Sequence, residues 1–444
     1  MKKRLVTLEP LWIGGVILLI YLLTLSPDVA WAHHGADSGD LVTAAVTGRA
    51  PHPPGFPLYT WLASVFVRVP WGTPAWRLNL LSALSAAGAA VATTATVQQR
   101  NHNRTIAAVS GLTLGCAPLL WSQAVIAEVY APATCLTAVL LWWRERSVET
   151  RAQAAIAGLL WGLGIAVHPT LLFLAPLWLT VRRDLWPVLL SGFALGLTPY
   201  TLLPLHGPWP QPWGDLRTLD GWWTYVSARL YHGFAFALPL AQWPQRWLAW
   251  AAVLARQFSP VGAPVALLGV QQGWRKTKPW SIAGPLLALL LVSIYAVGYN
   301  TTDSLVYLTP FLPVIALWLS DGIATLAEHR IPPALWLLLP ALLLALNWAT
   351  IDLSNEQEPH HWAKTILNAA PPDAVLVTSQ DAHTFTLWYA QEGWGLRPDV
   401  VILDRDLWAH GHYRAFLEQR YSQEIAGPDA TGHCDVKKTT LHCP

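Results

Sequence analysis

Long apolar runs, separated by short polar links, fill residues 1–353 of the chain. Because one transmembrane helix takes about 20 apolar residues, these runs predict about eleven spanning helices. The first run, residues 11–25, follows a basic N-terminus and is also compatible with a signal peptide. The later runs favour a retained anchor, and they lie at residues 75–97, 105–121, 123–143, 153–167, 169–181, 186–204, 246–270, 280–298, 304–327 and 331–350.

Two polar segments, residues 28–74 and 205–244, interrupt the apolar pattern. In the first, residues 40–47 predict a short helix, with Ser38 in place to cap its N-terminus. Residues 58–69 predict an amphipathic stretch that lies on the membrane surface. The two segments are therefore expected to be the large loops of the membrane domain.

The chain changes character after residue 353. Residues 354–444 have mixed polarity and no phosphate-binding glycine motif. Short apolar runs typical of strands alternate there with helical patterns, which predicts a small soluble α/β domain. The strand-like runs are 374–377 and 400–403, and the helical patterns are 360–369, 384–391 and 411–422.

Composition supports a membrane protein. Hydrophobic residues make up 53% of the 444 residues and charged residues 12%, whereas a soluble domain carries about 25% charged residues. The 27 tryptophans suit the aromatic belts found at membrane–water boundaries. The formal net charge of +2 argues against a nucleic-acid partner.

Basic residues recur in alternate links between the apolar runs. With the N-terminus in the cytoplasm, all five basic clusters fall on the cytoplasmic side, as the positive-inside rule expects. Both polar segments and the C-terminal domain then lie outside. The clusters are Arg100 and Arg104; Arg144, Arg146 and Arg151; Arg182 and Arg183; Arg275, Lys276 and Lys278; and Arg330.

Two cysteines lie near the C-terminus, Cys434 and Cys443. They could pair if that end faces an oxidising compartment. The adjacent His433 and His442 also raise the alternative of a metal site, although the spacing matches no standard zinc motif.

Two carboxylates and a histidine follow the first apolar run closely. Asp37 and Asp40 are three residues apart, so one helical turn would place both on one side. One could take a proton from an acceptor hydroxyl, or both could be ordinary surface residues at a helix start. His52 lies in the motif Pro51-His52-Pro53-Pro54-Gly55, where stiff backbone could present an imidazole to a phosphate or form a plain turn.

Further polar residues share this predicted outer face. A carboxylate such as Glu128 near the end of a span is costly unless it is paired or faces a cavity. His168 is alternatively a helix cap, and Trp222 alternatively a membrane anchor. This convergence predicts an active site that opens outward, with substrate-binding candidates His52, Arg77, Glu128, Tyr130, His168 and Trp222.

Four stretches carry a resemblance to a known family: residues 37–41 (DSGDL), 52–59 (HPPGFPLY), 76–83 (WRLNLLSA) and 121–130 (WSQAVIAEVY). The chain resembles a bacterial multi-pass membrane family of unknown function that is related to eukaryotic protein O-mannosyltransferases. These proteins resemble the GT-C class of glycosyltransferases. The resemblance implies an α-helical, GT-C-like polytopic protein in a bacterial cytoplasmic membrane.

The resemblance also implies a reaction. A sugar, with mannose as the candidate, would pass with inversion from a polyprenyl-phosphate donor to a hydroxyl of an unknown protein, lipid or glycan acceptor. Asp37 matches the acidic residue of the first outer loop, which is catalytic in this class. Asp40 stands where the family usually has Glu, so its part in catalysis is less well defined. No cofactor is implied, and a divalent cation is left open.

Two other kinds of membrane protein are weighed against this enzyme. A lipid or glycolipid flippase would favour charges near the bilayer midplane and broken helices in repeated halves, and the sequence shows neither. A non-catalytic membrane scaffold, with the tail binding a partner, is the other alternative.

Overall fold

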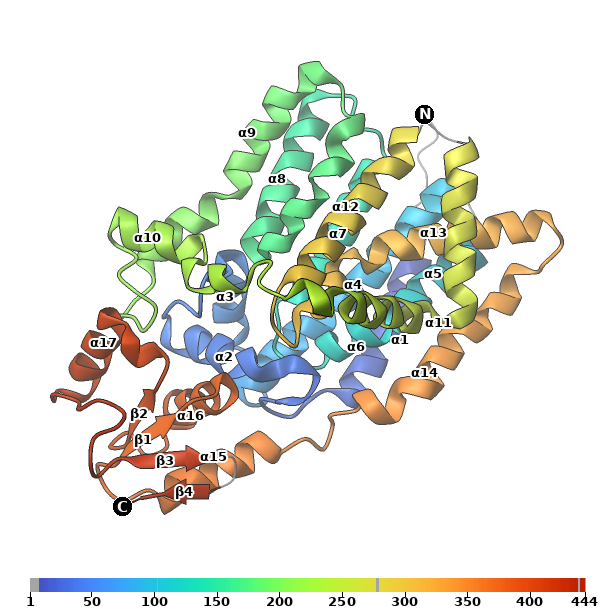
Figure 1. The fold of residues 1–444 in the computed structure, drawn as a ribbon. Helices are drawn as coiled ribbons and strands as arrows, with labels where there is room; N and C mark the ends of the chain where they lie inside the picture. Colours follow the sequence, from blue (N-terminus) through green and yellow to red (C-terminus); the bar gives the residue numbers. More distant parts are fainter. Residues whose placement is uncertain (1–7, 102, 277–278, 438–439, 444) are drawn as a thin grey trace.

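The computed structural model describes residues 8–101, 103–276, 279–437 and 440–443. A large helical body carries a small α/β domain at one end, beside the loops that join its helices (Figure 1). The helices of the body are α1 (Glu9–Thr24), α2 (Ser38–Thr47), α3 (Pro57–Phe66), α4 (Pro74–Asn101), α5 (Arg104–Gly115), α6 (Pro118–Ala124), α7 (Tyr130–Arg144), α8 (Arg151–Val167), α9 (Trp186–Gly196), α10 (Leu219–Val226), α11 (Trp243–Lys276), α12 (Pro279–Gly298), α13 (Leu312–Glu328) and α14 (Leu338–Ile351).

Short 3-10 segments join or extend several of these helices. They are η1 (Ala32–Asp37), η2 (Pro169–Thr180), η3 (Arg183–Leu185), η4 (Thr198–Leu205), η5 (Arg229–Phe234), η6 (Leu240–Gln242), η7 (Ser304–Phe311) and η8 (Pro333–Leu337).

The number of spans differs from the prediction of about eleven. In the described ranges, 6 helices are long and apolar enough to cross a membrane, or 7 if the pair α5 and α6 is one span bent by 61°. The bend falls where Pro118 starts a new helix, because proline cannot continue the preceding one. Other apolar runs form shorter helices, namely Glu9–Thr24, Arg151–Val167 and Pro169–Thr180.

Small residues let two of the helices approach closely. Gly158 and Gly162 on α8 face Gly192 and Gly196 on α9. A Cβ atom on Gly158 would lie 1.9 Å from the carbonyl oxygen of Leu189, and one on Gly196 would lie 2.4 Å from that of Leu159. Glycines four residues apart are the usual means of close helix packing inside a bilayer.

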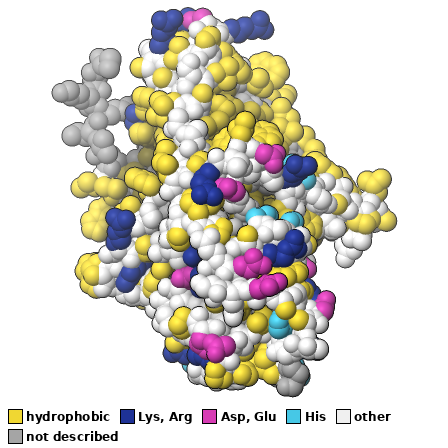
Figure 2. All heavy atoms as spheres, turned by 90° about the vertical axis from the view of Figure 1, so that its left-hand side faces the viewer, with side chains coloured by type: hydrophobic (Ala, Val, Ile, Leu, Met, Phe, Trp, Pro, Cys, Tyr) yellow, Lys and Arg dark blue, Asp and Glu magenta, His cyan; other side chains and the backbone are white. Residues whose placement is uncertain are grey.

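The surface of the body matches a membrane environment. Large apolar side chains are exposed on helices far apart in sequence, including Trp12 (71% exposed), Leu248 (72%) and Leu346 (66%). Figure 2 shows hydrophobic side chains over much of the upper half of one face, while charged side chains gather at the top and in the lower half. The chain is thus a helical polytopic membrane protein.

The C-terminal domain has a four-stranded sheet with the strand order β2-β1-β3-β4. Strand β1 pairs in parallel with β2 and β3, and β4 pairs antiparallel with β3. The two predicted strands and three predicted helices are confirmed, whereas β3 and β4 were not predicted. The elements are α15 (Glu358–Ala369), β1 (Val375–Thr378), α16 (Asp381–Trp394), β2 (Val401–Asp404), η9 (Leu407–Ala409), α17 (Gly411–Tyr421), β3 (Cys434–Lys437) and β4 (Thr440–His442).

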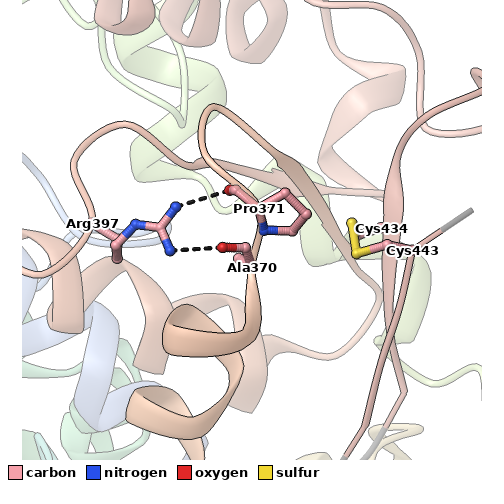
Figure 3. The surroundings of a disulfide bond; sticks show 5 residues. All are labelled: Ala370, Pro371, Arg397, Cys434 and Cys443. Carbon is pink, nitrogen blue, oxygen red and sulfur yellow. Dashed lines mark hydrogen bonds between the residues drawn. A yellow bond between two sulfur atoms is a disulfide. The ribbon is translucent and has the colours of Figure 1, made fainter.

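A disulfide links Cys434 to Cys443 and so joins β3 to the end of the chain (Figure 3). In the same region Arg397 donates hydrogen bonds to the carbonyl oxygens of Ala370 (2.8 Å) and Pro371 (2.9 Å). Of the two alternatives predicted for these cysteines, a disulfide or a metal site, the structure shows the disulfide.

Helix α16 docks the C-terminal domain onto α2 of the body. A Cβ atom on Gly39 would lie 2.6 Å from the backbone of Phe385, so the two helices touch where only glycine fits. The indole nitrogen of Trp31 donates to the hydroxyl of Thr386 at 2.9 Å. Arg49 pairs with Glu392 at 2.9 Å. The helix that follows Asp37 is thus held from the side of the C-terminal domain.

Candidate active site

Helix α2 presents the first two candidate carboxylates differently. Ser38 is the first residue of the helix and not its cap, a correction to the prediction; its hydroxyl donates instead to the carbonyl oxygen of Ala127 at 3.0 Å. Asp37 takes the N-cap position without a side-chain capping bond. Its side chain is 37% exposed, whereas that of Asp40 is 4% exposed. Only Asp37 is therefore accessible to a substrate.

Asp40 holds His52 in place. One oxygen of its carboxylate, Oδ2, accepts hydrogen bonds from the backbone N–H of His52 at 2.6 Å and from the ring Nδ1 at 2.8 Å. The other ring nitrogen, Nε2, lies 3.7 Å from Oδ2 of Asp37. The imidazole therefore lies between a buried carboxylate that orients it and an accessible carboxylate beside the cavity.

The proline-rich segment around His52 is fixed from several sides. The backbone N–H of Ala50 donates to the side chain of Gln211 at 2.8 Å. The hydroxyl of Tyr225 donates to the carbonyl oxygen of Pro51. Gly55 has φ +87° and abuts the Tyr225 ring, leaving no room for a side chain. These contacts add to the restraint that proline itself imposes on the backbone, so they support the prediction of a stiff loop.

Asp37 and His52 line a cavity of about 680 Å³. Four carboxylates line it, from Asp37, Glu128, Asp303 and Asp381, and none of the lining residues in the described part of the chain is Lys or Arg. The histidines of the lining are His34, His52, His168 and His232. Positive charge in this cavity must therefore come from imidazole or from a bound molecule.

Glu128 is a buried residue of the cavity lining. It is 2% exposed, and its Oε1 atom has no hydrogen-bond partner. Its other oxygen, Oε2, accepts from the backbone N–H of Val129 at 3.3 Å. Since a buried, unpaired carboxylate oxygen is costly, this atom is suited to accept a hydrogen bond from a ligand.

Aromatic side chains form another wall. The ring of His168 stacks on Phe56 at 5.7 Å and lies 5.0 Å from Tyr130, while Tyr307 lies 5.8 Å from His168. His168 Nδ1 interacts with the hydroxyl of Thr170 at 2.7 Å. The structure thus brings Tyr130 and His168 to the cavity alongside Asp37, His52 and Glu128.

The charges shift the proton affinities of Asp37 and His52. Burial raises the pKa of Asp37; His52 opposes this rise and Asp40 adds to it. For His52, burial lowers the pKa, but Asp37 and the hydrogen bond to Asp40 outweigh it and raise the pKa to about 9. At neutral pH the imidazole is therefore cationic.

Two predicted substrate-binding residues lie elsewhere. Arg77 donates to the carbonyl oxygens of Trp71 (2.9 Å) and Gly72 (3.0 Å), so it closes the turn after α3. The indole nitrogen of Trp222 donates to the carbonyl oxygen of Tyr200 at 2.9 Å. Neither residue lines the cavity, and both have local structural partners that the sequence did not reveal.

Other lining residues were not singled out from the sequence. Asp381, an exposed residue at the start of α16, lines the cavity, and desolvation there, followed by the charge of Asp37, raises its pKa to about 6. Tyr231, from η5, lies 6.4 Å from the ring of His52. No local motif marks either residue; the predicted placement of both large segments and the tail on one face was the only available signal.

The donor set does not fit a divalent cation. Within the described ranges, no group of three or more His, Cys, Asp or Glu side chains is placed to hold one metal ion. We therefore assign no step of the proposed reaction to a divalent cation.

A second cleft, of about 940 Å³, lies among the basic links of the body. Its charges are largely paired. Arg100 contacts Glu145 (2.5 Å) and Asp321 (3.1 Å), and Lys276 contacts Glu328 (3.3 Å).

The fold belongs to the GT-C-like type, as the sequence led us to expect. The structure is similar to that of ArnT from Cupriavidus metallidurans bound to undecaprenyl phosphate, with a TM-score of 0.56, 13% identity and 90% of each chain covered. At this identity the likeness shows the fold alone.

Sequence comparison adds a family relationship. Residues 37–183 match the N-terminal domain of protein O-mannosyl-transferase TMEM260, and residues 359–424 match TMEM260-associated domain 2. The chain is 26% identical to protein O-mannosyl-transferase TMEM260 of Mus musculus over 85% of its length, and 22% identical to the Dictyostelium discoideum protein of that name over 88%. It spans 60% and 56% of those relatives. The chain is therefore related to the TMEM260 protein O-mannosyltransferases.

Proposed function

We propose that this protein is an inverting membrane glycosyltransferase that moves a sugar, with mannose as the candidate, from a polyprenyl-phosphate donor to a hydroxyl of a protein. The observation that carries the proposal is the accessible Asp37 carboxylate beside His52 in a cavity of about 680 Å³. The relationship to protein O-mannosyltransferases supports the sugar and the acceptor. The GT-C-like fold, shared with an ArnT bound to undecaprenyl phosphate, supports the lipid donor.

Asp37 is the general base of this proposal. As the acceptor oxygen bonds to the anomeric carbon, the bond from that carbon to the phosphate oxygen breaks, and the hydroxyl proton passes to Asp37. Its raised pKa makes it a better proton acceptor than an ordinary aspartate. Asp40 acts through His52, which it orients, and does not touch the substrate.

The leaving phosphate gains negative charge during this step, and donors placed near it stabilise that charge. With no Lys or Arg in the described lining of the cavity, the cationic His52 and the hydroxyl of Tyr130 are the groups we assign to it. Glu128 and His168 are assigned to hydroxyl groups of the sugar. Arg77 and Trp222, which have partners elsewhere, keep no direct role.

The proposal includes an orientation. The basic links support an N-terminus in the cytoplasm, with the cavity and the C-terminal domain outside. The disulfide between Cys434 and Cys443 agrees with an oxidising compartment, for which a bacterial cytoplasmic membrane is our candidate. If the shorter apolar helices α1, α8 and η2 also cross, the described ranges hold 9 or 10 spans, which is still below the predicted count of about eleven.

The experiment uses purified protein and a radiolabelled polyprenyl-phosphate mannose with Thr-containing peptides. The enzyme is expected to transfer label to peptide and to release polyprenyl phosphate. Lipid movement across a vesicle membrane without cleavage would instead support the flippase. Binding of the donor with neither result would support the scaffold.

A further inference from the structure

The C-terminal domain contributes a carboxylate to the candidate active site. Asp381 is the first residue of α16 and lines the same cavity as Asp37, although more than 340 positions separate them in the sequence. Helix α16 packs directly on α2 at Gly39 and Phe385. The position of Asp381 relative to Asp37 is therefore set by a close helix contact, not by a free loop.

The described lining of the cavity is rich in acidic side chains. Asp37, Glu128, Asp303 and Asp381 line it, and the described lining residues include no Lys or Arg. His52 is cationic at neutral pH because its pKa is raised, but Asp37 and Asp40 already lie on either side of it. A polyprenyl-phosphate donor would add further negative charge.

The aromatic part of the lining also suits a cationic ligand. Rings of Tyr231, Phe234, Tyr299 and Tyr307 line the same cavity as Asp381, and a cation over such rings gains attraction from their quadrupoles. A Lys or Arg side chain beside Asp381 would gain this attraction and pair with the carboxylate.

We propose that Asp381 is a specificity-determining residue that binds a Lys or Arg beside the hydroxyl residue of a peptide acceptor, so that the protein selects basic acceptor sequences. This inference rests on the proposed function. Asp381 contacts the flanking cation, while Asp37 contacts the hydroxyl that reacts. Asp37 and Asp381 thus bind neighbouring residues of one acceptor peptide.

The test compares three peptides that share one Thr and differ only in the next residue, which is Lys, Leu or Glu. With the full-length protein and labelled donor, kcat/KM should fall from Lys to Leu to Glu, with roughly a tenfold range because the like-charge pair replaces an attractive one. Raising the salt concentration should narrow the range.

Variants then assign the preference to a residue. Asp381→Asn should lower transfer to the Lys peptide and raise transfer to the Glu peptide, and Asp381→Lys should favour the Glu peptide. Asp406→Asn, an exposed carboxylate of the same domain outside the cavity lining, is the matched control and should keep the wild-type order.

The outcomes separate this inference from the function on which it rests. Equal rates for the three peptides, or an equal loss for all three in Asp381→Asn, would overturn the charge preference while transfer itself stands. A failure to label any peptide would contradict the peptide-acceptor function and the inference with it.

Discussion

Two polar cavities of the protein differ in whether their acidic side chains have basic partners. In the cleft among the basic links, Arg100 joins Glu145 and Asp321, and Lys276 joins Glu328. In the cavity beside α2, four carboxylates meet no Lys or Arg of the described lining. The charges of the cleft satisfy each other, whereas the cavity carboxylates are opposed only by histidines in the described lining and keep their capacity to bind a ligand. The comparison therefore assigns a structural role to the cleft and a chemical role to the cavity.

The strongest way to break this comparison is to neutralise one carboxylate in each region. Asp37→Asn should lower kcat by at least about a hundredfold, because a general base contributes roughly 10²–10⁴-fold. Glu149→Gln, an exposed carboxylate lining the cleft, should leave kcat unchanged. Both are measured by transfer of labelled sugar, with tryptophan fluorescence to confirm folding. Similar losses in the two variants would contradict the assignment.

The next effect concerns the paired cleft. Arg100→Met leaves two partly buried carboxylates without their cation, so we expect a loss of about 1–3 kcal/mol in the free energy of unfolding, read as a lower Tm. Activity per folded molecule should stay near wild type. Reduced activity in a variant of unchanged Tm would give the cleft a functional role and would weaken the comparison.

Asp40→Asn removes the group that orients His52, and kcat should fall roughly tenfold, since an oriented hydrogen-bond partner is worth about 1–2 kcal/mol. In the wild type, activity should decline as pH rises through about 9, where His52 loses its proton. The variant lacks one source of that raised pKa, so its decline should start at a lower pH. If the pH at which activity declines is the same in Asp40→Asn and the wild type, deprotonation of His52 does not cause the decline.

The same raised pKa has a consequence for stability. Because the folded-state pKa of His52 lies above its ordinary value, its contribution is fully present below about pH 6.5 and is lost as pH rises through about 9. The Tm of the wild type should therefore fall over this window by more than that of Asp40→Asn.

A smaller effect is expected at the domain contact. Glu392 pairs with Arg49 and Arg420, which ties the segment before His52 to α16. Glu392→Gln should lower kcat by roughly threefold. This corresponds to an activation free energy about 0.7 kcal/mol higher, because the site is less well aligned. Unchanged kinetics would show that the close packing at Gly39 suffices for alignment.

The smallest effect is expected for an exposed pair of the cleft. Lys276 and Glu328 are 55% and 63% exposed, and such surface pairs contribute about 0–1 kcal/mol. Lys276→Met should change Tm and activity within error. A clear change in activity would again argue for chemistry in the cleft.

Much of this architecture followed from local patterns. Apolar runs located the helices of the body, and short apolar runs that alternate with helical patterns in the tail located β1, β2, α15, α16 and α17. The number of spans was harder to predict, because Pro118 divides the apolar run 105–121, which reads as continuous. Hydropathy does not register such breaks.

The site was partly predictable for a similar reason. Asp37, His52 and Glu128 share a membrane face, and topology alone gathers such residues. Arg77 was misjudged because its carbonyl partners lie in a turn whose geometry has no sequence signature. Asp381 could not be found, because its place depends on how α16 packs against α2.

The central claim is that Asp37 removes a proton during sugar transfer in an outward-opening cavity. The most direct measurement is transfer of radiolabelled mannose from polyprenyl phosphate to a Thr peptide by purified wild type and by Asp37→Asn. The account predicts labelled peptide and released polyprenyl phosphate with the wild type and almost none with the variant. Transfer by Asp37→Asn at the wild-type rate would contradict it.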